Sequence, residues 1–276
     1  MSASSELTSG ASAAALPPRP LALVTGASAG IGKVFAQRLA ARGHDLLLVA
    51  RDETRLRALA EELALRYGVR AEFLPADLAR DDGIRTVAER VSQSGQLAIL
   101  VNNAGVGTRG KLVDRPVAEQ ASMLKLHTMA PMVLTRAALP GMIERGNGLI
   151  INVASVASFI AAAGRVNYCA TKAYLRIFSE GLALELAGTG VQVQALCPGF
   201  TRTEFHDRAA ITEASIPSYL WLDVDVVVDQ SLAQAARRGP TVCVPSARFK
   251  LIVLLLKYLP AWVKSGAQLS YGRTGE

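Results

Sequence analysis

Cysteine is scarce in this 276-residue chain. The three cysteines, Cys169, Cys197 and Cys243, show neither the number of a disulfide framework nor the spacing of metal ligands. We therefore expect reduced, structural thiols, no metal site and a cytoplasmic location. The Ala/Ser-rich first twenty residues lack a basic segment followed by a long apolar stretch, so we expect no secretory signal and interpret residues 1–19 as a disordered tail.

Aromatic residues and long apolar runs are also rare. Aromatics make up 5% of the chain although half of its residues are hydrophobic, so Ala, Val, Leu and Ile must build the core, as in helices packed on a parallel sheet. The run Leu251–Leu256 is too short to cross a bilayer, which takes about 20 apolar residues. The net charge is +7, but Arg and Lys are scattered and no basic block is interleaved with aromatics. This pattern excludes nucleic acid as the expected partner and leaves a basic surface that serves solubility or attracts a phosphorylated cofactor.

Short apolar runs alternate with amphipathic segments from Leu21 onward. This alternation predicts right-handed βαβ units, and hence an α/β, doubly wound parallel sheet of about seven strands with helices on both faces. No repeat or linker divides the chain, so we expect a single domain. The expected strands are Leu21–Thr25, Asp45–Ala50, Ala71–Pro75, Leu97–Asn102, Leu149–Asn152, Val191–Cys197 and Thr241–Val244; the expected helices are Lys33–Arg42, Glu53–Tyr67, Arg85–Gln93, Gln120–Arg145 and Val166–Ala187.

A glycine-rich loop directly follows the first expected strand and opens a helix. It reads Thr25-Gly26-Ala27-Ser28-Ala29-Gly30-Ile31-Gly32. Gly26 would permit the tight turn, Gly30 would let the backbone approach a pyrophosphate, and Gly32 would let helix and strand pack closely. The helix N-terminus would present N–H groups to phosphates, so this context predicts a nucleotide site rather than a plain turn.

The end of the second strand indicates which nicotinamide cofactor would bind. An acid there would bond the ribose 2′-hydroxyl of NAD(H), whereas a cation would meet the 2′-phosphate of NADP(H). The sequence places Arg51 at this point, followed by Asp52. We expect NADP(H) to be preferred, with NAD(H) left open by Asp52; the alternative is a surface Arg51 that pairs with Asp52 or Glu53.

Three residues predict acid/base chemistry. Tyr168 and Lys172 are four residues apart and share one helix face, where an ammonium would lower the pKa of the phenol. Ser155 closes the fifth strand thirteen residues before Tyr168, so its hydroxyl could reach the same substrate oxygen. By themselves, a tyrosine and a lysine at this spacing are usually only a helix surface.

In these features the chain resembles the short-chain dehydrogenase/reductase family, a Rossmann-fold family, from about Leu21 to Val244. The motifs stand in the family's order and spacing: Thr25-Gly26-xxx-Gly30-x-Gly32, Asp77-Leu78, Asn102-Asn103-Ala104-Gly105, Ser155, Tyr168-xxx-Lys172 and Pro198-Gly199 with Thr201 and Thr203. The resemblance implies that Asp77 and Leu78 meet the adenine and that Asn103, Ala104 and Gly105 line the cofactor. It also implies that Pro198, Gly199, Phe200, Thr201 and Thr203 hold the nicotinamide side, and that Ser28, Ala29 and Ile31 contribute through the glycine-rich loop.

One position departs from the family pattern. The family usually carries an asparagine in a proton relay to the lysine, and alignment on Thr135-Arg136 places His127 there. We favour a packing role for the His127 side chain, and the alternative is an imidazole that joins the relay and makes the rate pH-sensitive.

The expected function is therefore NADP(H)-dependent interconversion of a ketone or aldehyde and an alcohol, with Tyr168 as the general acid/base. Two alternatives have the same fold: a non-catalytic NADP-binding regulatory or scaffold protein, and a carrier-protein ketoacyl reductase. The resemblance also implies a homodimer or homotetramer, for which Leu175–Leu186 offers an apolar stripe.

Two segments lie outside the alternation. Phe200–Leu222 follows a strand's carboxyl end, where open α/β sheets bind ligands, so we expect it to shape the substrate site. We divide the chain into a catalytic domain, residues 20–248, and an apolar extension, residues 249–276. Within the extension, Phe249–Trp262 is expected to pack as a helix beside Phe200–Leu222 and to wall a cleft for a lipophilic substrate. Weak contact with a membrane surface is the second reading, and a plain dimer contact is the third.

Overall fold

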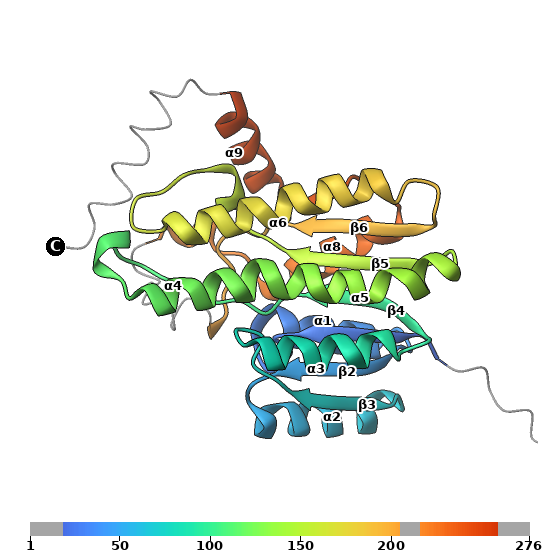
Figure 1. The fold of residues 1–276 in the computed structure, drawn as a ribbon. Coiled ribbons are helices and arrows are strands. Elements are labelled where there is room, and N and C mark those ends of the chain that lie inside the picture. The colour runs from blue at the N-terminus through green and yellow to red at the C-terminus, as the bar shows by residue number, and fades with distance from the viewer. Residues whose placement is uncertain (1–18, 205–215, 259–276) are drawn as a thin grey trace, which may run out of the picture.

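The computed structural model describes residues 19–204 and 216–258 and contains, within them, a seven-stranded parallel sheet covered by helices on both faces (Figure 1). The strand order is β3-β2-β1-β4-β5-β6-β7. This arrangement confirms the predicted doubly wound fold. The strands are β1 (Leu21–Thr25), β2 (Asp45–Ala50), β3 (Ala71–Pro75), β4 (Leu97–Asn102), β5 (Gly148–Val153), β6 (Val191–Leu196) and β7 (Val242–Cys243).

Parts of three predicted segments lie outside the described residues: the N-terminal tail, the middle of Phe200–Leu222, and everything after Tyr258.

The helices alternate with the strands along the chain. The helices are α1 (Gly30–Ala40), α2 (Glu53–Tyr67), α3 (Asp81–Ser92), α4 (Val117–Leu124), α5 (Ala130–Glu144), α6 (Val166–Glu185), α8 (Val224–Ala236) and α9 (Ala247–Tyr258), with the 3₁₀ turns η1 (Leu112–Asp114), η3 (Val156–Phe159) and η5 (Ser218–Leu220) and the π-helical segment η2 (Lys125–Met129).

Two hydrophobic cores form because successive strand residues point to opposite faces of the sheet. On β1, Val24 belongs to the core beneath α1, α2 and α8, whereas Leu23 belongs to the core beneath α3 and α5. Both faces of the sheet are therefore covered, which explains the continuous apolar strands. No helix within the described residues is long and apolar enough to cross a membrane.

Two features of the helices differ from the sequence prediction. The segment Gln120–Arg145, expected as one helix, is divided into α4, η2 and α5, so that His127 lies in a π-helical turn. Helix α8 was not predicted, because its Val-rich start reads equally well as a strand. Tertiary packing decides the outcome, since Val227, Val228 and Leu232 are buried against the sheet.

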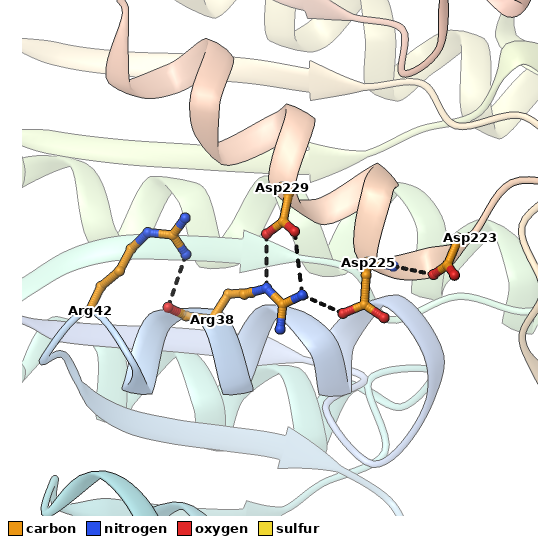
Figure 2. Close-up of polar contacts among 5 residues, drawn as sticks. All are labelled: Arg38, Arg42, Asp223, Asp225 and Asp229. Carbon is orange, nitrogen blue, oxygen red and sulfur yellow. Dashed lines mark hydrogen bonds and ion pairs between the residues drawn. The ribbon is translucent and has the colours of Figure 1, made fainter.

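An ion-pair cluster holds α8 to α1. Arg38 on α1 donates from Nε to Asp229 Oδ1 at 2.8 Å and from Nη2 to Asp225 Oδ1 at 2.5 Å, as Figure 2 shows. Asp223 caps α8 by accepting from the Asp225 N–H at 2.9 Å. The start of α8 is thus tied to the helix that follows the glycine-rich loop.

Candidate active site

Ser155, Tyr168 and Lys172 lie together at the carboxyl end of β5. Ser155 follows the strand directly and caps η3 by accepting from the Ala157 N–H at 3.1 Å. Tyr168 and Lys172 come from the first two turns of α6, and Tyr168 hydrogen-bonds Ser155. Lys172 Nζ donates to the Val153 carbonyl at 2.8 Å and lies 5.9 Å from the centre of the Tyr168 ring. The structure therefore brings the three predicted side chains into one cluster.

The charges in this cluster differ from the sequence expectation. Burial raises the pKa of the Tyr168 phenol above its usual value, and the hydrogen bond from Ser155 and the charge of Arg165 oppose this shift only in part. Burial also lowers the pKa of Lys172 to about 8. Burial, and not the neighbouring Lys172, is thus the largest influence on the phenol pKa, contrary to the sequence expectation. Tyr168 is a protonated phenol at neutral pH.

His127 is fully buried, and both of its ring nitrogens have partners. Nε2 accepts from the Val106 N–H at 2.9 Å, and Nδ1 lies 3.0 Å from Thr171 Oγ1. Because Thr171 Oγ1 donates to the Tyr168 carbonyl at 3.0 Å, it accepts from Nδ1, which assigns the neutral imidazole with its proton on Nδ1. Burial, followed by the charge of Lys172, keeps the pKa of His127 well below 6.5. The side chain connects the loop after β4 to the catalytic helix.

The glycine-rich loop is crowded, and this crowding explains its glycines. Gly26 and Gly30 have φ values of +65° and +53°, which favour glycine. A Cβ on Gly32 would lie 2.3 Å from the Gly26 carbonyl oxygen, and one on Gly30 would lie 3.1 Å from Thr203 Cβ. Helix α1 begins at Gly30 without a side-chain cap on its N-terminus, so its first N–H groups and the positive end of its dipole suit a phosphate. Ser28, Ala29 and Ile31 share this loop.

Thr25 and Asn103 join the glycine-rich loop to the end of β4. Asn103 Nδ2 donates to the Thr25 carbonyl at 2.9 Å and to the Gly26 carbonyl at 3.2 Å. Thr25 Oγ1 accepts from the backbone N–H groups of Asn103 at 2.9 Å and of Ala104 at 3.0 Å. Asn103 therefore holds the glycine-rich loop against the end of β4, whereas the resemblance implied only that it lines the cofactor. Gly105 lies beside His127, whose Nε2 would be 3.1 Å from an added Cβ.

At the end of β2 the acidic neighbours of Arg51 are engaged elsewhere. Asp52 caps α2 by accepting from the Arg55 N–H at 3.0 Å, and Glu53 pairs with Arg57 at 2.6 Å. Arg51 is exposed and forms no ion pair with any of the residues that the structure describes. The alternative in which Arg51 pairs with Asp52 or Glu53 is not what the structure shows.

An ion pair that the sequence did not reveal joins the start of α2 to the segment after β6. Arg55 Nη1 at the start of α2 lies 2.8 Å from Glu204 Oε2, which follows Thr203. The adjoining segment is also held: Thr201 Oγ1 donates to the Gly199 carbonyl at 3.0 Å, and Val156 N–H donates to the Pro198 carbonyl at 3.0 Å. Pro198 to Thr203 thus lie between Ser155 and the glycine-rich loop, where the resemblance places the nicotinamide side.

Helix α9 reaches the same loop. Phe249 is 3% exposed, and a Cβ on Gly199 would lie 2.2 Å from its ring, so Gly199 leaves the space that Phe249 fills. Arg248 donates to the Tyr219 carbonyl. The rings of Phe200 and Trp221 pack at a tilt of 54° with their centres 5.9 Å apart, next to Ile216. The first turn of α9 therefore packs against Gly199 and near the described end of the Phe200–Leu222 segment.

Asp77 and Leu78 occupy the turn after β3. Asp77 is half-buried and accepts from the Ala79 N–H at 3.0 Å, and Leu78 is buried in the core beneath α3. A Cβ on Gly83 would lie 2.2 Å from the Asp77 carbonyl oxygen, so α3 packs tightly on this turn. Leu78 is therefore a core residue, and Asp77 is the more accessible of the two.

A buried polar network that the sequence did not reveal lies under the site. Asn102 Nδ2 donates to Asn152 Oδ1 at 2.8 Å, and Asn152 Nδ2 donates to Ser179 Oγ at 2.9 Å. Asn102 Nδ2 also reaches Thr135 Oγ1 at 3.2 Å. The network joins β4 and β5 to α5 and α6, and so fixes the catalytic helix on the sheet. Among the described residues, no group of three or more His, Cys, Asp or Glu could hold a metal ion.

Comparison with known proteins places this geometry in a family. The family model of the short chain dehydrogenases matches residues 20–214. A relative from Aquifex aeolicus, the 3-oxoacyl-acyl-carrier-protein reductase FabG, is 37% identical over 186 residues, which are 67% of this chain and 75% of that protein.

Solved structures extend the comparison to most of the chain. A short-chain dehydrogenase from Sphingobium yanoikuyae in complex with NADPH has 37% identity and a TM-score of 0.80, with 93% of this chain and 98% of that chain covered. A bulky-bulky ketone specific alcohol dehydrogenase from Comamonas testosteroni has 34% identity and a TM-score of 0.75, with 88% and 95% covered. The chain belongs to the short-chain dehydrogenase/reductase family, is an oxidoreductase, and uses a nicotinamide dinucleotide.

Proposed function

We propose that this protein reduces a ketone or aldehyde, using NADPH, to the corresponding alcohol. The observation that supports this proposal is the cluster of Ser155, Tyr168 and Lys172 beside the glycine-rich loop. The bound nicotinamide would supply the hydride, and the chain would supply orientation and the proton.

The protonation states favour the direction of reduction. Ser155 and the Tyr168 hydroxyl would hold the carbonyl oxygen, and Tyr168 would donate its proton as negative charge develops on that oxygen. The Tyr168 phenol carries its proton at neutral pH and can donate it, whereas oxidation would need the phenolate. The Lys172 ammonium, 5.9 Å from the ring centre, would stabilise the charge that forms.

NADP(H) is the proposed cofactor, with NAD(H) as the weaker alternative. Arg51 stands at the end of β2, is exposed, and has no ion-pair partner among the described residues. A guanidinium suits the two-pronged binding of a 2′-phosphate. The Sphingobium yanoikuyae structure holds NADPH, which supports the same choice.

A lipophilic substrate is the proposed class. Phe200, Trp221 and Ile216 form a small apolar cluster beyond the carboxyl end of β6, and the inner face of α9 packs near it. We propose that these residues wall the substrate cleft. The name of the Comamonas testosteroni enzyme, specific for bulky-bulky ketones, supports a bulky carbonyl compound.

Replacement of Tyr168 by Phe tests the catalytic assignment. The variant keeps the ring but loses the proton, so turnover should fall at least about a thousandfold, within the range of general acid catalysis. NADPH binding, followed by fluorescence, should remain close to that of the wild type. Unimpaired turnover would refute the assignment, and loss of NADPH binding would show a damaged groove instead.

A second candidate is reduction of a carrier-bound 3-oxoacyl group, favoured by the Aquifex aeolicus relative. NADPH consumption over a panel of ketones, aldehydes, steroids and acyl thioesters separates the two. Activity confined to thioesters would support the second candidate, and no activity on any substrate would support a non-catalytic, NADP-binding protein.

We also propose a homodimer or homotetramer built on α5 and α6. In the predicted stripe Leu175–Leu186, Leu175 and Leu182 are core residues, but Ile177 and Leu184 are exposed, as is Ile143 on α5. Light scattering at micromolar concentration tests the proposal, which a monomeric mass would contradict.

A further inference from the structure

Helix α9 presents an apolar face away from the molecule. Its inner side is occupied, because Phe249 is buried and Ile252 and Val253 pack against the core. Its outer side carries Leu251, Leu254, Leu255 and Tyr258, which are 58%, 52%, 52% and 77% exposed. A terminal helix needs one apolar face to dock on its own domain, so the outer face requires a second explanation.

The four exposed residues form one stripe, and cations border it. Positions 251, 254, 255 and 258 follow the spacing i, i+3, i+4, i+7, which places them side by side on a helix. Helical geometry puts Lys250 along one edge of this stripe and Arg248 along the other, and both residues are exposed. Figure 1 shows α9 at the periphery of the molecule, away from the sheet.

The net charge of the protein is concentrated in the same part of the chain. Residues 1–229 contain 23 Lys and Arg against 22 Asp and Glu, whereas residues 230–276 contain 7 against a single acid, Glu276. The C-terminal part therefore contributes +6 of the total charge of +7. An apolar stripe with a cation at each edge, and with no acid in the helix, matches an anionic lipid surface: leucines enter the acyl boundary while basic groups meet the headgroups.

We propose that the outer face of α9 docks the protein on anionic membranes. A second copy of the chain is a poorer occupant, because a two-fold contact through this face would bring the basic edges of both helices together without a compensating acid. The substrate cleft is also a poorer occupant, because α9 turns its inner side to the domain. Docking does not depend on the catalytic assignment, so either proposal can fail without the other.

Vesicle flotation of the full-length protein tests the proposal. The wild type should float with vesicles of phosphatidylcholine mixed with phosphatidylglycerol and stay behind with vesicles of phosphatidylcholine alone. The double variant Leu251→Glu/Leu254→Glu should lose at least about tenfold in partitioning, since it places charge in the stripe. Lys250→Gln should lose about fivefold, the effect of one basic residue near an anionic surface, and high salt should weaken the wild type in the same way.

Leu65→Glu is the matched control. Leu65 is a leucine on α2 that is 91% exposed, so its replacement adds one of the two acids of the double variant at a place outside the stripe, and this acid should leave flotation nearly unchanged. NADPH binding by each variant verifies that the fold is intact. Failure of the wild type to float with anionic vesicles would overturn the proposal. So would a Leu251→Glu/Leu254→Glu variant that floats normally, or one that only converts an oligomer to a monomer, which would make the stripe a subunit contact.

Discussion

The Lys172 ammonium is a group of the site that titrates close to neutral pH. Its pKa of about 8 means that the ammonium is lost as pH rises through that value, while Tyr168, with its raised pKa, stays protonated. We expect kcat/KM for carbonyl reduction to fall about tenfold per pH unit above this pKa, because the stabilising charge disappears. In Lys172→Arg the guanidinium stays charged. The fall of kcat/KM at alkaline pH should therefore begin at a higher pH, whatever the absolute rate of the variant. If kcat/KM of this variant still begins to fall near pH 8, the titrating group is not Lys172.

At the same scale, His127 should influence stability and not the proton transfer. Its folded-state pKa lies well below the unfolded value of 6.5, so the unfolded chain takes up a proton that the native protein does not. Stability should therefore decrease as pH falls below about 6.5, by up to about 1.4 kcal/mol per pH unit for this residue. Urea unfolding at several pH values gives the free energy of unfolding as a function of pH, and this free energy should fall less steeply with decreasing pH in His127→Gln than in the wild type. Half-buried His44, whose pKa is also lowered by burial, remains in both proteins, so the difference isolates His127. An unchanged slope would contradict the neutral imidazole.

We propose that Arg51 determines the choice between the two nicotinamide cofactors. Arg51→Ala should weaken NADPH binding roughly tenfold to a hundredfold, the value of a hydrogen bond to a charged group, and leave NADH binding unchanged. Fluorescence titration of each variant with NADPH and with NADH measures the two affinities. Arg57→Ala is a suitable control, because Arg57 already pairs with Glu53. Equal weakening of NADPH and NADH would indicate a damaged loop and not a lost phosphate contact.

Between elements, the packing of α8 on α1 depends on Arg38. Asp229, first through its hydrogen bond, raises the pKa of Arg38, and Asp225 adds to this shift, so the pairing is favourable (Figure 2). Arg38→Gln should lower the free energy of unfolding by about 1 kcal/mol, since the pairs are partly exposed, and the loss should shrink at high salt. Chemical denaturation measures it. Arg42→Gln loses only an exposed bond to the Arg38 carbonyl and should be nearly neutral. Equal effects of the two changes would show that the cluster does not hold α8.

Elements also explain why Ser155 and Tyr168 meet. Strand β5 positions Ser155, and helix α6 positions Tyr168. The chain of hydrogen bonds through Asn102, Asn152 and Ser179 fixes these two elements to each other. Every member is buried, so loss of one would leave a polar partner unsatisfied. The relative position of Ser155 and Tyr168 thus rests on residues outside the cluster of Ser155, Tyr168 and Lys172.

At the scale of the whole molecule, the proposed cleft wall depends on which side of α9 faces the rest of the domain. Removal of everything from Phe249 onward would also remove a core residue, so a point change is the sharper test of the cleft wall. Ile252→Ala on the inner face should raise KM roughly tenfold for lipophilic ketones, through lost apolar contact, and little for small ones. Leu251→Ala on the outer face is the control and should change neither. An equal loss for both substrate classes would indicate destabilisation and remove the cleft-wall proposal.

The sequence by itself determined the parts of this protein that depend on neighbouring residues. The first four strands and the helix Glu53–Tyr67 have their predicted bounds, because the apolar runs and the 3.6-residue periodicity are local signals. The glycine-rich loop and the spacing of Tyr168 and Lys172 are local for the same reason. A parallel sheet then places the ends of its strands on one edge, which is why Ser155 could be assigned to the site before its contacts were known.

The tertiary structure decided what depends on distant partners. The two nitrogens of His127 bind Val106 and Thr171, and Arg55 meets Glu204 far along the chain, pairings that no local pattern encodes. Burial reversed the expected shift of the Tyr168 pKa, because desolvation is set by everything packed around the ring. Packing likewise made α8 a helix and turned one side of α9 inward and the other outward. Sequence periodicity reports which residues are apolar, but only the folded neighbours decide which of them meet protein and which meet the surroundings.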